Sequence, residues 1–131
     1  MPGTVDARLA ELGLTVPEMK APLAAYVPHV MTGNLLFVSG QVSLGPDGLV
    51  TGQLSGADND GSAELDRAVD AARLCALNLI AAVKDATGDL DRVSRVVKLT
   101  GFVNGAADFT QHPKVINGCS ELLGEVFGDA G

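Results

Sequence analysis

The sequence predicts one α/β domain, and two observations carry that prediction. The chain has 131 residues, which suits one domain and leaves no room for two. Its hydrophobic patterns follow the order of a β-meander, a long helix, a strand and a second helix. With 47% hydrophobic and 19% charged residues but only four Phe, one Tyr and no Trp, the core is expected to be aliphatic.

The first half is predicted to form a short helix, an extended stretch and a β-hairpin. Thr4 is placed to cap a helix that ends at Gly13, and three prolines then favour extended backbone. Tyr26–Met31 and Leu35–Ser39 are typical of strands joined by a short turn with a glycine. The Gly-Pro-Asp-Gly turn at residues 45–48 predicts a short third strand after it.

The second half is predicted to hold two helices separated by a strand. Apolar residues at three- and four-residue spacing indicate a long helix, capped at residues 60–62 and ended by Gly88. Val93–Val103 alternates apolar and polar residues, which predicts a strand with one buried face. Pro113 is placed to begin the last helix, which Gly128 ends. Because such an order usually returns to the sheet, a final strand is expected next.

Charge and composition count against several functions. Nine basic and sixteen acidic residues give a net charge of −7 with no basic run, so binding to nucleic acid is not expected. No apolar run approaches the length of a membrane span, and the N-terminus does not resemble a signal peptide. Two distant cysteines and two distant histidines predict no metal site, and the common nucleotide-binding motifs are missing. We therefore expect a cytoplasmic protein without metal or cofactor.

A few polar residues stand where an apolar pattern does not explain them. Ser39-Gly40-Gln41 ends an apolar strand, where a glycine lets a ligand approach and Ser and Gln can orient it. A β-bulge or a sheet edge explains this segment equally well. Asn78 lies among apolar helix residues, so its amide should bond to something specific, and we interpret it as structural. Asn117 poses the same question and stays open. Cys75 and Cys119 are interpreted as small buried hydrophobes.

An ordered set of short segments resembles a known family. These segments are Ala25–Pro28, GNLLFVSGQ at 33–41, the turn at 45–48, LNLIAAV at 77–83, VVKLTGFV at 96–103, and Asn117 with Phe127. Together they resemble the RidA family, also called YjgF-like or reactive-intermediate deaminase proteins and often labelled endoribonuclease L-PSP. The resemblance covers the chain from about residue 21 onward and leaves residues 1–20 as an N-terminal extension. The extension and the last helix resemble a longer branch of the family.

The resemblance implies a fold, an assembly and an activity. The fold is chorismate-mutase-like, a single domain over residues 1–131 with a mixed β-sheet and two long helices packed on one face. The assembly is a homotrimer with a cleft at each subunit interface. RidA proper hydrolyses enamines and imines to a keto acid and ammonia without metal or cofactor. By position, Tyr26 would line the cleft for a small carboxylate, Ser39 and Gly40 would approach it, and Asn117 would shape its wall.

The sequence departs from the family in one respect. The family's arginine, which binds the substrate carboxylate, follows the last helix, and this sequence ends at Gly131 before it. We expect either that the complete protein continues past Gly131 or that it binds no carboxylate in the RidA manner. Three functions therefore stay open: imine hydrolysis, non-enzymatic binding or regulation by a small metabolite, and endoribonuclease or translation-inhibitor activity, which the net charge disfavours.

Overall fold

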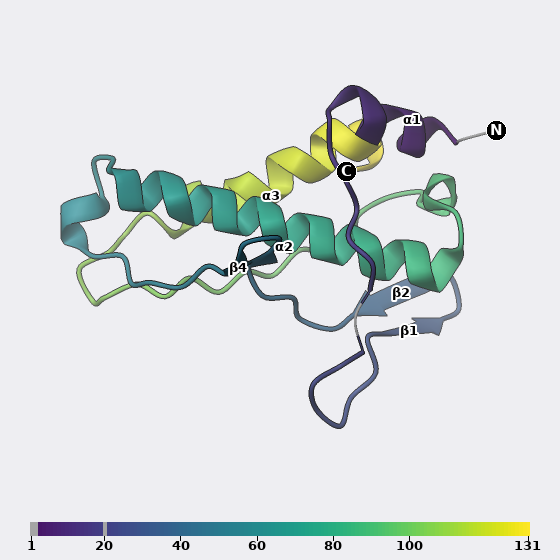
Figure 1. The fold of residues 1–131 in the computed structure, drawn as a ribbon, viewed down its shortest axis with the longest axis horizontal. Helices are drawn as coiled ribbons and strands as arrows, with labels where there is room; N and C mark the ends of the chain where they lie inside the picture. The colour runs from purple at the N-terminus through teal and green to yellow at the C-terminus, as the bar shows by residue number, and fades with distance from the viewer. Residues whose placement is uncertain (1–2, 20) are drawn as a thin grey trace.

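The computed structural model describes residues 3–19 and 21–131, so residues 1, 2 and 20 of the expected N-terminal extension lie outside it. Within these ranges α2 runs the length of the molecule, with α1 and α3 along one side and the β1–β2 hairpin on the other (Figure 1). The elements are α1 (Thr4–Glu11), β1 (His29–Thr32), β2 (Leu35–Val38), β3 (Leu44–Gly45), β4 (Gly48–Leu49), α2 (Ala63–Thr87), α3 (His112–Phe127) and three 3-10 turns, η1 (Gly56–Asp58), η2 (Leu90–Arg92) and η3 (Gly128–Ala130).

Helix α2 begins and ends as the sequence predicts. The Ser62 hydroxyl accepts a hydrogen bond from the backbone N–H of Leu65, which satisfies one of the free donors of the first turn. Gly88 ends the helix with φ at 74°, a conformation that glycine adopts at little cost. Although α2 has 25 residues, no helix in the described part of the chain is long and apolar enough to cross a membrane.

Helices α2 and α3 form the core by close approach. Pro113 lies in the first turn of α3, as predicted. Leu122 of α3 and Ala76 of α2 are fully buried. Gly118 lies where the helices are closest, since a Cβ there would be 2.5 Å from the carbonyl oxygen of Val69. Small residues at this crossing therefore set the distance between the two helices.

The β1–β2 hairpin presents two different faces. His29 pairs with Val38 and Val30 with Phe37 in an antiparallel register. Side chains alternate along a strand, so His29 and Val38 face α2, whereas Val30 and Phe37 face outward, 52% and 60% exposed. The first strand begins at His29 rather than at Tyr26, because the preceding Pro28 has no N–H to donate to a ladder.

The prediction of a strand at Val93–Val103 is wrong for this structure. The described residues form two two-stranded antiparallel sheets rather than one mixed sheet, and this segment belongs to neither. An extended segment becomes a strand only through a neighbour's hydrogen bonds, and here only a single parallel bridge follows it, between Leu54 and Gly105. Leu99 and Val103 pack on the core, as a buried face of this segment requires, but Val97, which the alternation places on the same face, is 74% exposed.

Helix α1 is held in place by a residue far along the chain. Thr4 does not cap it as predicted: the capping position is Gly3, which has no side chain. The Asp91 carboxylate accepts hydrogen bonds from the backbone N–H groups of Thr4 and Val5, both at 2.8 Å. Val5 and Leu9 then bury against the core. The N-terminal helix is thus part of the packed domain.

Replacing Asp91 with alanine is expected to loosen α1 selectively. The change leaves two helix N–H groups without an acceptor, which costs about 1–2 kcal/mol as for other lost helix caps. Limited proteolysis should cut the variant after residue 11 faster than the parent protein, while α2 and α3 stay protected. An alanine at Asp47, in the turn between β3 and β4, serves as the control. Equal cutting rates in the Asp91 variant and the parent protein would contradict the capping role.

Candidate functional site

Ser39 and Gly40 lie at the end of β2, where the hairpin opens. The backbone N–H and the hydroxyl of Ser39 both donate to the carbonyl oxygen of Pro28, at 2.9 Å and 3.0 Å. These two hydrogen bonds to Pro28, the residue before β1, fix the orientation of the Ser39 side chain. The Ser39 hydroxyl oxygen keeps lone pairs free to accept a further hydrogen bond.

Gly40 is open to approach from outside. No atom lies within 4 Å of the position that a Cβ would occupy on Gly40, and the residue is exposed. Gln41 curls back, and its side-chain amide donates to the carbonyl of Ser39 at 3.3 Å. The backbone at Gly40 is therefore exposed, and the residues on both sides of it are fixed by hydrogen bonds. A ligand could reach the backbone groups of Gly40 in this arrangement.

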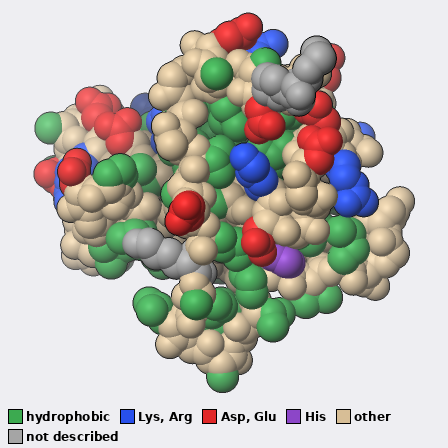
Figure 2. Space-filling view, turned by 45° about the vertical axis from the view of Figure 1, so that its right-hand side comes forward, with side chains coloured by type: hydrophobic (Ala, Val, Ile, Leu, Met, Phe, Trp, Pro, Cys, Tyr) green, Lys and Arg blue, Asp and Glu red, His purple; other side chains and the backbone are tan. Residues whose placement is uncertain are grey.

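Tyr26 lies at the same end of the hairpin, two residues before Pro28. Its side chain is 50% exposed. Figure 2 shows hydrophobic side chains on the surface of this lower part of the molecule. Large hydrophobic side chains that are exposed as one contiguous patch often mark an interaction surface, whereas single scattered ones do not. The outer apolar face is the side of the hairpin that carries Val30, Leu35 and Phe37, all of them exposed.

Asn117 does not join the other predicted site residues within one chain. It lies exposed on α3, and α3 packs mainly on α2, on α1 and on its own terminal turn. The hairpin instead packs on α2. One chain therefore brings Tyr26, Ser39 and Gly40 together and leaves Asn117 on a different element.

Asn78 has the specific partners that the sequence required. Its side-chain amide donates to the carbonyl oxygens of Val42 and Leu44, at 3.1 Å and 3.0 Å. The interpretation of Asn78 as structural is thus confirmed. The sequence did not reveal that its partners belong to the segment that leaves Gly40.

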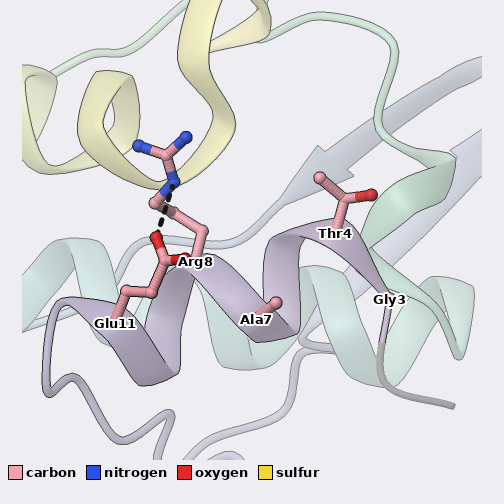
Figure 3. A pocket seen from close by; sticks show the side chains of 5 residues that line it. All are labelled: Gly3, Thr4, Ala7, Arg8 and Glu11. Carbon is pink, nitrogen blue, oxygen red and sulfur yellow. Dashed lines mark ion pairs between the residues drawn. The ribbon is translucent and has the colours of Figure 1, made fainter.

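Two hollows in the surface lie away from these residues. One, of about 350 Å³, is formed by residues on one side of α1 (Figure 3). Arg8 and Glu11 form an ion pair there at 3.7 Å, and both side chains are exposed. The other, of about 190 Å³, lies between residues 96–99 and the end of α3. Neither hollow includes Tyr26, Ser39, Gly40 or Asn117.

Arginines are engaged away from the hairpin. Arg8 pairs with Glu11, Arg67 with Glu64, and Arg73 with Glu125, while Arg92 donates to the carbonyl of Thr87.

Sequence reasoning missed one polar pair at the hairpin. The Nε2 atom of His29 lies 2.8 Å from a carboxylate oxygen of Asp85 on α2. The pair ties the inner face of the hairpin to α2, opposite the face that carries Phe37. The other histidine, His112, packs its ring against Phe109 at a centroid distance of 5.0 Å. A single histidine in a strand carries no local signal of such a partner.

The carboxylates of Asp58, Asp89 and Asp91 serve the fold. Asp58 accepts from the hydroxyl of Ser62 at 2.6 Å and from the backbone N–H of Ser55 at 2.8 Å. These hydrogen bonds, the Ser62 bond first, lower the pKa of Asp58 below its ordinary value. Asp89 accepts from the N–H of Asp91, which itself caps α1. The hydrogen bonds of Asp58 and Asp89 are therefore local and structural.

Both thiols are poor nucleophiles in this environment. Burial raises the pKa of Cys75. Burial, followed by the proximity of Cys75, raises the pKa of Cys119 to about 11. The thiolate is the reactive form, so both groups react slowly. Cys119 is buried in the core as interpreted from the sequence, whereas Cys75 is only partly buried.

Alkylation of Cys119 is expected to be slow in the folded protein. A rise of the pKa from 9.0 to about 11 lowers the thiolate fraction near pH 8 about a hundredfold. A thiolate with a higher pKa is intrinsically more nucleophilic, which offsets part of the loss in thiolate fraction. We therefore expect the labelling rate to be about tenfold lower than in the unfolded chain. The rate should rise with pH up to the raised pKa. Iodoacetamide labelling of the parent protein with and without denaturant, with the label on Cys119 located by peptide mass, measures it, and equal rates would contradict the burial effect.

The hairpin, the two long helices and the matched residues define a YjgF-like protein. The family described as "YjgF/chorismate_mutase-like, putative endoribonuclease" matches residues 6–131. The chain belongs to this family and has its fold. The match begins at residue 6 and so includes most of α1.

Similar proteins come from distant organisms. Protein TCP17 of Trypanosoma cruzi is 43% identical over 128 residues, which are 97% of this chain and 77% of the relative. A solved structure of a "putative endoribonuclease" from Shewanella oneidensis MR-1 is 36% identical with a TM-score of 0.86, over 98% of this chain and 82% of that one. The protein Atu1372 of Agrobacterium tumefaciens, described with unknown function, is 41% identical with a TM-score of 0.81, over 96% of this chain and 75% of that one.

Proposed function

We propose that the protein hydrolyses reactive enamines and imines to a keto acid and ammonia, in a cleft between the subunits of a homotrimer. The observation that carries the proposal is the open Ser39-Gly40 span beside the half-exposed Tyr26, at the border of the outer apolar face. Membership of the YjgF family supports it. The expected substrate is a small carboxylate.

The inter-subunit part of the proposal rests on the two separated halves of the site. Asn117 is exposed on α3, and the hairpin residues lie on the opposite side of α2. A neighbouring copy packed on the outer apolar face would cover Phe37 and Val30, and its own side chains would complete the cleft. Burial of these apolar side chains would stabilise the assembly.

Hydrolysis of an imine requires few catalytic groups from the protein. The carbon of an imine is already electrophilic, so water adds to it and the resulting tetrahedral adduct expels ammonia. Catalysis then consists mainly of holding the substrate beside a water molecule and stabilising the charge that develops. The Ser39 hydroxyl can accept a hydrogen bond from substrate or water, the exposed Gly40 backbone lets the substrate approach, and Tyr26 can cover it.

The lifetime of an imino acid tests the proposal. A small imino acid is generated in situ by an amino-acid oxidase, and a competing nucleophile traps whatever has not been hydrolysed. The protein should shorten the lifetime after dialysis against chelator, and Tyr26→Phe and Asn117→Ala should each reduce the acceleration. Leu12→Ala, at the residue that follows α1, is the control. No acceleration with several imino acids, for a protein of confirmed trimeric mass, would leave metabolite binding or regulation as the better function.

The description of the family as an endoribonuclease supports a second candidate, cleavage of RNA. The net charge of −7 opposes it, because RNA binding draws on basic residues that attract phosphate. A gel-shift titration with single-stranded RNA at two salt concentrations decides between the two. Salt-sensitive binding at low micromolar protein would favour the RNA function, and its absence would leave the deaminase ahead.

A further inference from the structure

We propose that Asn78 is a positioning residue, which fixes the backbone on one side of Gly40 and so keeps the Ser39-Gly40 span ready for substrate. The inference rests on the proposed function for its catalytic consequence. Its structural consequence can be measured without any activity.

Asn78 binds a loop rather than its own helix. Its two contacts, at 3.1 Å and 3.0 Å, go to the carbonyls of Val42 and Leu44, more than thirty residues away. Asn is a poor residue for the interior of a helix. Its presence within α2 is therefore explained by the segment that it holds.

A second contact on the same face of α2 supports this role. Leu74 lies one helical turn before Asn78 and packs against Gly45, where a Cβ would be 3.0 Å from the leucine methyl groups. The backbone N–H of Leu44 also donates to the carbonyl of Val42 at 2.8 Å, which forms a tight turn. Helix α2 thus holds residues 42–45 by one polar and one apolar side chain.

The opposite side of Gly40 is anchored independently. Ser39 is fixed by its two hydrogen bonds to the carbonyl of Pro28. Gly40 itself touches nothing through the Cβ position, and glycine has the widest conformational freedom of any residue. The open span is therefore bracketed by two anchors, Pro28 in front and Asn78 behind. Loss of the second anchor frees the span from one end.

A matched pair of isosteric changes tests the inference. Asn78→Asp replaces the donating amide with an oxygen that faces two carbonyls, and Asn104→Asp makes the same change at a distance from the site. The side-chain amide of Asn104 donates to the carbonyl of Gly52 at 2.6 Å, beside the first half of α2. Asn78→Asp loses two side-chain hydrogen bonds to backbone and Asn104→Asp loses one, but only the bonds of Asn78 hold the segment that follows Gly40.

Hydrogen exchange gives the structural readout. The amide of Leu44, which donates to the carbonyl of Val42 in the turn that Asn78 holds, should exchange about tenfold faster in Asn78→Asp and unchanged in Asn104→Asp, because local opening follows the lost anchor. In the imine assay, KM should rise about tenfold for Asn78→Asp while Asn104→Asp keeps the parent KM. Unchanged exchange of the Leu44 amide, or equal changes in both variants, would overturn the inference.

The two proposals fail in distinguishable ways. If the parent protein does not accelerate imine hydrolysis, the proposed function fails, and the exchange experiment still decides whether Asn78 orders the span. If the parent protein is active and Asn78→Asp keeps its KM despite faster exchange, the positioning role for this substrate is refuted.

Discussion

Alanine at Gly118 is expected to destabilise the protein, whereas alanine at Gly124 on the same helix is expected to stabilise it. A Cβ at Gly118 would lie 2.5 Å from the carbonyl oxygen of Val69 and 3.3 Å from the Cβ of Ala72. The oxygen belongs to the backbone of α2 and cannot rotate away, so the two helices must separate. Such overpacking costs about 1–3 kcal/mol.

Gly124 supplies the matched control. Nothing lies within 4 Å of its Cβ position, so the added methyl group meets no neighbour. Alanine is favoured over glycine in a helix by about 1 kcal/mol, and this gain has nothing to offset it there. Denaturant unfolding of both variants should therefore give free-energy changes of opposite sign. A Gly118→Ala protein as stable as the parent would show that the helices are not in the close contact described.

Glutamate at Phe37 is expected to dissociate the proposed homotrimer. Phe37 lies on the outer apolar face, 60% exposed in the single chain, and the proposal buries it against a neighbouring copy. An unpaired carboxylate at that position would lose its hydration in each interface, which costs several kcal/mol per site. Sedimentation velocity should show about one third of the parent mass, and imine hydrolysis should fall with it.

Leu12→Glu is the control for this experiment. Leu12 follows α1, on the other side of α2 from the hairpin, and is also an exposed hydrophobic residue. The same chemical change should leave the mass of the assembly unaltered. A Phe37→Glu protein that keeps the parent mass, or a monomeric parent, would refute assembly through the outer apolar face.

The sequence by itself determined the helices and the family. Helix α2 could be predicted because Ser62, Gly88 and the apolar spacing between them are local signals, and local signals act through the chain's own backbone. The same holds for Pro113 at the start of α3. The ordered segments from Ala25 to Phe127 pointed to the YjgF-like fold, which the family match and the solved relatives confirm.

The tertiary structure decided every feature that depends on a distant partner. Val93–Val103 alternates as a strand does, but a strand needs hydrogen bonds from a neighbour, and the described residues supply only isolated ones. Asp91 caps a helix 86 residues away, and Asn78 holds a loop that is distant in sequence. Contacts between residues that are distant in the sequence arise from tertiary packing, so no local sequence pattern predicts them. This is why Asn78 and Asn117, alike in sequence, have different surroundings in the fold.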